Sequence, residues 1–167
     1  TDIAGLMARG ELSPVELTAH MLERISVLDG QLNSYQTVMA EQAMAAAAKA
    51  ESEIVSGRYR GPLHGIPVAV KDLCFTRGVP TRGGLAVLRD FVPDYDATVV
   101  ARLESAGAIL LGKLNLTEGA MAGYHPEFKI PVNPWGSDLW PGASSSGSGV
   151  ATAAGLCFAA LGTDTGG

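Results

Sequence analysis

Apolar residues recur at helical spacing near the start of the chain. Leu17, Met21, Ile25 and Leu28 lie three or four positions apart, which predicts an amphipathic helix. The preceding residues 13–16, Ser-Pro-Val-Glu, have the form of a capping box with proline at the first helical position. This stretch therefore predicts both a helix and the point at which it begins.

A second helix is predicted over residues 37–56, since Ala43–Ala48 is a run of strong helix formers with one methionine. Asp29-Gly30 is expected to end the first helix, and Gly57 to cap the second. Neither helix carries a motif for a site. Residues 1–60 are therefore predicted to be a helical region that packs against another part of the domain.

From Gly61 onward the pattern changes to short apolar runs between turns rich in glycine and proline. Strands are predicted over residues 66–70, 108–111 and 158–162, and Pro67 places the first at a sheet edge or at a strand start. The helices expected between them are one capped by Asp96 and ended by Gly107, a short one starting at Asn115, and one over 147–155. Alternating helices and strands indicate the α/β class.

Composition agrees with one folded domain. The 167 residues are 47% hydrophobic and 17% charged, with a net charge of -5, so disorder is excluded. Without a basic patch, nucleic acid is not expected as a main partner. No apolar run has the roughly 20 residues that a membrane span needs. Cys74 and Cys157 are expected to be reduced, buried thiols, and a cytoplasmic location is the expectation.

Lys71 is the first residue that could carry chemistry, because it follows the apolar run 66–70 and precedes Asp72. Burial at a strand end would favour the neutral amine, and a neutral amine is a general base. The alternative is a solvated lysine paired with Asp72. Local sequence leaves both open.

Four serines fall within five positions, at 144, 145, 146 and 148, in a glycine-rich segment. Such a loop can bring hydroxyl groups close together, or it can simply be a polar loop that caps the next helix. Further on, paired glycines at 166–167 are suited to an oxyanion hole, or to an ordinary turn. Asp164 is expected to order this loop through backbone hydrogen bonds.

The three histidines, His20, His64 and His125, have no metal-site spacing. A Ser-His-Asp triad would need a partner among them, and the chain lacks the G-x-S-x-G elbow.

Four stretches together resemble the amidase signature family: residues 11–17, 61–72, 96–115 and 141–167. The resemblance covers essentially the whole chain, and the order and spacing of the stretches make it specific. It implies the amidase signature fold, a mixed and mostly parallel β-sheet covered by helices. On this interpretation residues 1–167 are the N-terminal part of a single domain, with the catalytic core starting at residue 61.

The resemblance also implies a Ser–cis-Ser–Lys triad. Lys71 matches the lysine, and Ser144 matches the serine that follows a cis peptide bond and relays the proton. Ser145 matches an auxiliary hydrogen-bonding position, and Thr165, Gly166 and Gly167 match the oxyanion turn. Ala143 departs from the family, which has glycine there.

The family nucleophile corresponds to the position after Gly167. The chain is therefore expected to be the N-terminal part of a longer enzyme, or to break at a chemically modified serine.

The function that the resemblance implies is hydrolysis of a carboxamide or anilide, or of a related ester or carbamate, through an acyl-enzyme. It implies no metal and no organic cofactor. The expected partner is a small-molecule amide substrate, without nucleic acid or membrane, and a homodimer stays open as the assembly. Two alternatives are the amidase subunit of a glutamine-dependent tRNA amidotransferase and a non-catalytic binding member of the fold.

Overall fold

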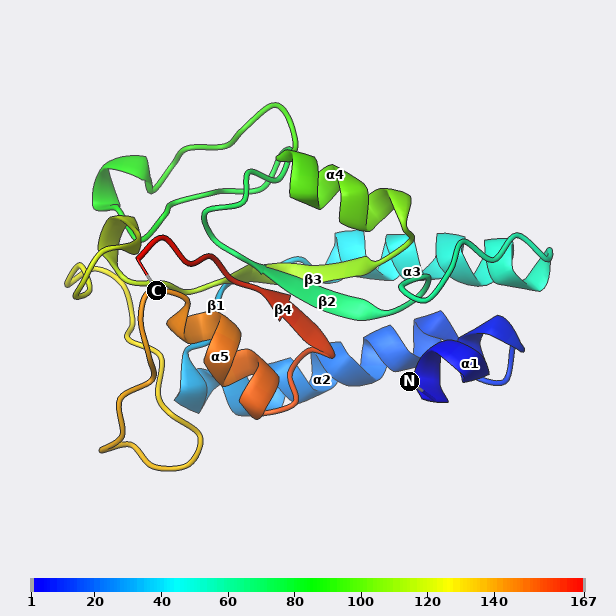
Figure 1. Ribbon diagram of the computed structural model, residues 1–167, viewed down its shortest axis with the longest axis horizontal. Helices are drawn as coiled ribbons and strands as arrows, with labels where there is room; N and C mark the ends of the chain where they lie inside the picture. The colour runs from blue at the N-terminus through cyan, green and yellow to red at the C-terminus, as the bar shows by residue number, and fades with distance from the viewer. Residues whose placement is uncertain (1, 167) are drawn as a thin grey trace.

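The sheet at the centre of the molecule orders its strands β1-β3-β2-β4 (Figure 1). The structure is a computed structural model that describes residues 2–166. Its strands are β1 (Tyr35–Val38), β2 (Pro67–Lys71), β3 (Ile109–Leu114) and β4 (Ala159–Leu161). β2 pairs in parallel with both β3 and β4, whereas β1 is antiparallel to β3. This arrangement confirms the predicted α/β class with a mixed, mostly parallel sheet.

Helices cover both sides of this sheet. Their bounds are α1 (Asp2–Ala8), α2 (Pro14–Leu32), α3 (Ala40–Val55), α4 (Thr98–Ser105) and α5 (Ser146–Ala153), with 3-10 turns at Ala86–Leu88 and Glu118–Ala120. In Figure 1, α2 and α5 lie on one side of the sheet and α4 on the other. No helix within residues 2–166 combines the length and apolarity needed to cross a membrane.

The predicted start of α2 is confirmed, but its predicted end is wrong. Ser13 Oγ accepts a hydrogen bond from the Glu16 amide at 3.1 Å, as an N-cap should. The helix continues through Asp29-Gly30 to Leu32 and ends where Asn33 adopts a left-handed conformation, φ 53°. Asp29 instead organises the exit turn, because its carboxylate accepts from the Ser34 amide at 2.8 Å.

The second helix was predicted to begin too early. Residues 35–38 form β1, in which Val38 pairs with Gly112 of β3, and α3 begins only at Ala40. A Cβ atom added to Gly112 would lie 2.2 Å from the Thr37 carbonyl oxygen, so glycine permits this close approach of strands. Pairing across the sheet decides the conformation here, because it overrides local helix propensity. Gly57, with φ +79°, follows the helix end as predicted.

Two further local predictions are wrong. Asp96 does not cap α4: Ala97 occupies the N-cap position, and the Asp96 carboxylate accepts from the Arg77 amide at 2.7 Å. Asn115 does not start a helix, because its amide donates to the Ser34 carbonyl at 2.8 Å and ties the end of β3 to the start of β1. Gly107 ends α4 as predicted, with φ +83°.

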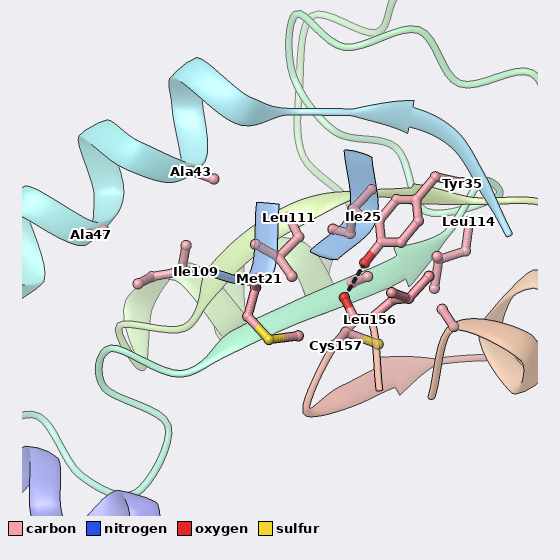
Figure 2. Packing of buried hydrophobic residues seen from close by; sticks show 12 residues of the cluster. Met21, Ile25, Tyr35, Ala43, Ala47, Ile109, Leu111, Leu114, Leu156 and Cys157 are labelled. Carbon is pink, nitrogen blue, oxygen red and sulfur yellow. Dashed lines mark hydrogen bonds between the residues drawn. The ribbon is translucent and has the colours of Figure 1, made fainter. Parts of the chain in front are cut away.

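Alternation along the strands divides the hydrophobic core in two. Ala69 of β2 belongs to the cluster that α2, α3 and α5 cover, while Val68 and Val70 belong to the cluster that includes α4. In the first cluster the Tyr35 hydroxyl donates to the Leu156 carbonyl at 2.9 Å (Figure 2).

Pro67 starts β2, which lies inside the sheet between β3 and β4. Both cysteines are free and buried, as predicted.

The three parallel strands end at one edge of the sheet. β2 ends at Lys71, β3 at Leu114 and β4 at Leu161, and the chain leaves each strand there through a loop. Sites in open α/β sheets lie at the carboxyl ends of parallel strands. Polar residues at or just after these ends are therefore brought together.

Candidate active site

Lys71 lies at the carboxyl end of β2 with its side chain fully buried. Its Nζ atom donates to two hydroxyl groups, Ser144 Oγ at 2.6 Å and Thr163 Oγ1 at 2.8 Å. Every residue of β2 is buried, so the strand holds the amine beneath two more accessible residues, Ser144, which is half-buried, and Thr163, which is exposed. The interpretation as a solvated lysine paired with Asp72 is therefore wrong.

The surroundings of Lys71 shift its protonation equilibrium toward the neutral amine relative to an exposed lysine. Burial lowers the pKa of the amine, while the nearby Cys74 thiol and Asp164 carboxylate raise it by a smaller amount. The two hydroxyl partners are uncharged, so they compensate little of the cost of a buried ammonium group. A buried amine of this kind can take a proton from a neighbouring hydroxyl group.

Ser144 approaches Lys71 from the loop that leads into α5. The Ala143–Ser144 peptide bond is cis, and the Ser144 carbonyl accepts from the Thr117 amide at 3.1 Å. The next turn is held by Gly147, whose amide donates to the Asn115 carbonyl at 2.9 Å. A Cβ atom at Gly147 would lie 2.5 Å from the Asn115 nitrogen and from the Ser34 oxygen. The loop therefore rests directly on backbone at the ends of β3 and α2.

Ser145 makes no hydrogen bond to Lys71 in this structure. It instead joins the loop before α5 to the segment after β4. Its Oγ accepts from the Thr163 amide at 3.1 Å and lies 3.2 Å from the Thr163 carbonyl, to which it donates. One turn on, Ser148 Oγ donates to the Leu161 carbonyl at 3.1 Å. The serine cluster thus fastens the start of α5 along the end of β4, and Figure 1 shows the two side by side.

Thr163 was not singled out from the sequence. It follows β4 by two positions and shares Lys71 with Ser144. No local pattern marks a threonine after a glycine as a partner of a lysine 92 positions away. Only the parallel pairing of β2 with β4 predicts that residues just after these two strands meet.

The predicted oxyanion turn lies at the exposed end of the described chain. Thr165 and Gly166 are exposed, and the Gly166 amide donates to Asp164 Oδ1 at 3.3 Å. This backbone hydrogen bond is of the kind expected of Asp164. Gly167 lies outside the described residues, so the oxyanion hole stays a prediction.

His64 lies apart from these serines. His64 precedes β2, at the strand end opposite Lys71, where its Nε2 lies 3.2 Å from Glu53 Oε2. Its Nδ1 accepts from the Arg60 amide at 3.1 Å. Within residues 2–166 no three side chains of the metal-ligating types gather in one place.

Comparison with known proteins shows which family the sequence resembles. The model of the family described as Amidase matches residues 16–167. A Mycobacterium tuberculosis protein with the provisional name amidase AmiD is 56% identical over 167 residues, which is 100% of this chain and 35% of that protein. A glutamyl-tRNA(Gln) amidotransferase subunit of Anaeromyxobacter dehalogenans is 47% identical, covering 98% of this chain and 34% of that protein.

A solved structure shares the fold of this chain. The native peptide amidase from Stenotrophomonas maltophilia superposes with a TM-score of 0.89 at 38% identity, over 95% of this chain and 34% of that chain. The chain therefore spans about a third of the length of the curated relatives it matches, 35% and 34% in the two cases above.

Proposed function

This chain belongs to the Amidase family, and from that premise we propose that the protein containing it hydrolyses carboxamides through a serine acyl-enzyme. The observation that carries the proposal is the 2.6 Å contact between Lys71 Nζ and Ser144 Oγ. A buried amine beside a serine hydroxyl is a base next to a proton carrier. The cis peptide bond before Ser144 accords with the relay position of a Ser–cis-Ser–Lys triad.

In the proposed reaction the nucleophile is a serine at the position after Gly167. Ser144 takes the proton of that serine and passes its own proton to neutral Lys71, while the nucleophile oxygen bonds to the amide carbonyl carbon. Backbone amides of Thr165, Gly166 and Gly167 would stabilise the oxyanion. The proton then returns from Lys71 through Ser144 to the leaving nitrogen as the C–N bond breaks. Water repeats the sequence to release the acid.

The first test is labelling of the complete protein with a fluorophosphonate, followed by peptide mass analysis. We expect one adduct, on the serine after Gly167, together with release of ammonia or aniline from simple carboxamides and anilides. Esters and carbamates belong in the same substrate panel, since the acyl-enzyme chemistry is shared. Absence of both labelling and turnover would contradict the proposal and favour a non-catalytic binding member of the fold.

A second candidate function is the amidase subunit of a glutamine-dependent tRNA amidotransferase. The 47% identity to the glutamyl-tRNA(Gln) amidotransferase protein of Anaeromyxobacter dehalogenans is the observation that favours it. Such a protein would release ammonia from glutamine and would support conversion of glutamyl-tRNA(Gln) when the other components of the complex are present. Hydrolysis of small anilides without glutamine-dependent conversion of charged tRNA would favour the first candidate.

A further inference from the structure

A second buried lysine lies next to the proposed base. Lys113 of β3 and Asp72, the residue directly after Lys71, form an ion pair in which Nζ and Oδ1 are 3.1 Å apart and both side chains are 0% exposed. Lys113 Nζ also donates to Thr81 Oγ1 at 2.7 Å. The proposed chemistry uses neither residue. Buried ion pairs are costly to form because both charges lose their hydration. A pair in this position, beside a base, is therefore a candidate for a functional role.

The pair and the base lie on opposite faces of β2. Successive side chains of a strand point to opposite faces, so Lys71 points toward Ser144 and Asp72 points away. Asp72 instead reaches the loop after β2, where its Oδ2 accepts from the Arg82 amide at 2.9 Å. Lys113 lies close to Asp72 because β3 runs parallel to β2 and Lys113 pairs with Val70.

Asp72 is also fixed through its backbone. Its amide donates to the Leu114 carbonyl and its carbonyl accepts from the Gly83 amide, each at 2.9 Å. The residue that follows Lys71 is thus held by two backbone and two side-chain contacts. This fixes the end of the strand from which Lys71 reaches its two hydroxyl partners.

Charge gives the pair a second consequence. A lone carboxylate buried beside Lys71 would favour the ammonium form of that lysine, and a lone ammonium would oppose it. Together Asp72 and Lys113 carry no net charge, whichever of them holds the shared proton. We propose that Lys113 is a positioning and charge-compensating residue for the base: it neutralises Asp72, so that Lys71 can be anchored by a buried carboxylate and still be neutral.

Other charged and titratable groups also face this region. They are Cys74 and Arg82 in the loop after β2, and Asp164 after β4. None of them is altered in the variants below, so their influence is the same throughout the series. The inference rests on the proposed role of Lys71 as base, and the test therefore needs one measurement that does not depend on turnover.

The test compares Asp72→Asn, Lys113→Met and the double variant in the complete protein. Each is prepared with lysine labelled with ¹³C at the ε carbon, and the Lys71 signal is assigned by its absence in Lys71→Ala. Titration of this signal gives the pKa of Lys71 directly. Separately, the rate of fluorophosphonate labelling is measured against pH, to show how it falls as the pH is lowered. Arg60→Met, which removes one positive charge from the Glu53–Arg60 pair at the other end of β2, is the matched control.

We expect Asp72→Asn to lower the pKa of Lys71 and Lys113→Met to raise it, each by about one unit, with the double variant close to the wild type. Arg60→Met should leave the titration unchanged. Shifts of the same sign in both single variants, or no shift in Asp72→Asn, would overturn the inference. If Lys113→Met does not fold, Asp72→Asn decides alone, since it is nearly isosteric. Titration shifts without any serine labelling would support the inference while contradicting the proposed function.

Discussion

Lys71 Nζ and Ser144 Oγ lie 2.6 Å apart although 73 positions separate the residues in sequence. The contact forms because β2 ends at the same sheet edge on which the loop before α5 rests, through Gly147 and Asn115. It joins a buried amine, which burial inclines toward the neutral form, to a hydroxyl group that can carry a proton. This relationship is the basis of the predictions below.

Replacing Lys71 with alanine should remove most of the turnover while the protein still folds. Loss of a general base typically lowers kcat about 10²–10⁴-fold, and Ser144 would keep its backbone contact to Thr117. Steady-state kinetics on an anilide, with circular dichroism to check the fold, measures both effects. Lys49→Ala, at an exposed position of α3, is the control. Near-normal kcat in Lys71→Ala would exclude this lysine as the base.

Turnover should fall as the pH is lowered. Burial lowers the pKa of Lys71, so more of the amine is neutral near pH 7 than in an exposed lysine. Below that pKa the neutral fraction falls about tenfold per pH unit, and kcat/KM should fall with it. A profile of kcat/KM against pH measures this fall. The residual activity of Lys71→Ala should not show it. A wild-type profile that is flat between about pH 5 and pH 8 would speak against a neutral lysine base.

Much of the fold was predictable from local sequence. The Ser13 cap of α2, the strand that ends at Lys71 and the glycines that end α3 and α4 depend on neighbouring residues, so periodicity and turn chemistry predict them. β1 was missed because its pairing with β3 overrides a helical tendency. The prediction that Asp96 caps α4 was wrong because the carboxylate instead accepts from a backbone amide 19 positions away.

The candidate site was predictable only in part. Local sequence marked Lys71 and the serine cluster as candidates, but the pairing of Lys71 with Ser144 came from the resemblance, since nothing local brings together residues of different elements. Thr163 and the Asp72–Lys113 pair were missed because both depend on the parallel pairing of β2 with its two neighbours. The order of strands in a sheet is a long-range property, and periodicity within one segment carries no information about it.

Thr163→Val should weaken the reaction without abolishing it. The substitution removes the hydroxyl that lies 2.8 Å from Lys71 Nζ, while the 3.1 Å contact between the Thr163 amide and Ser145 Oγ can persist. One hydrogen bond to a charged or reacting group corresponds to a loss of roughly tenfold in kcat. Thr163→Ser restores the hydroxyl and should restore the rate. A valine variant as active as the wild type would show that this contact has no part in turnover.

Gly147→Ala should damage the site through the backbone beneath it. The new Cβ would lie 2.5 Å from the Asn115 nitrogen and 2.6 Å from the Asn115 oxygen, so α5 must move away from the end of β3. Overpacking of this kind costs about 1–3 kcal/mol in the free energy of unfolding, and the move would also withdraw Ser144 from Lys71. Denaturant unfolding and labelling rates measure the two consequences. Gly149→Ala, two positions further along the same helix and with open space around its Cβ, should lose neither stability nor labelling rate; equal effects from both variants would contradict the argument.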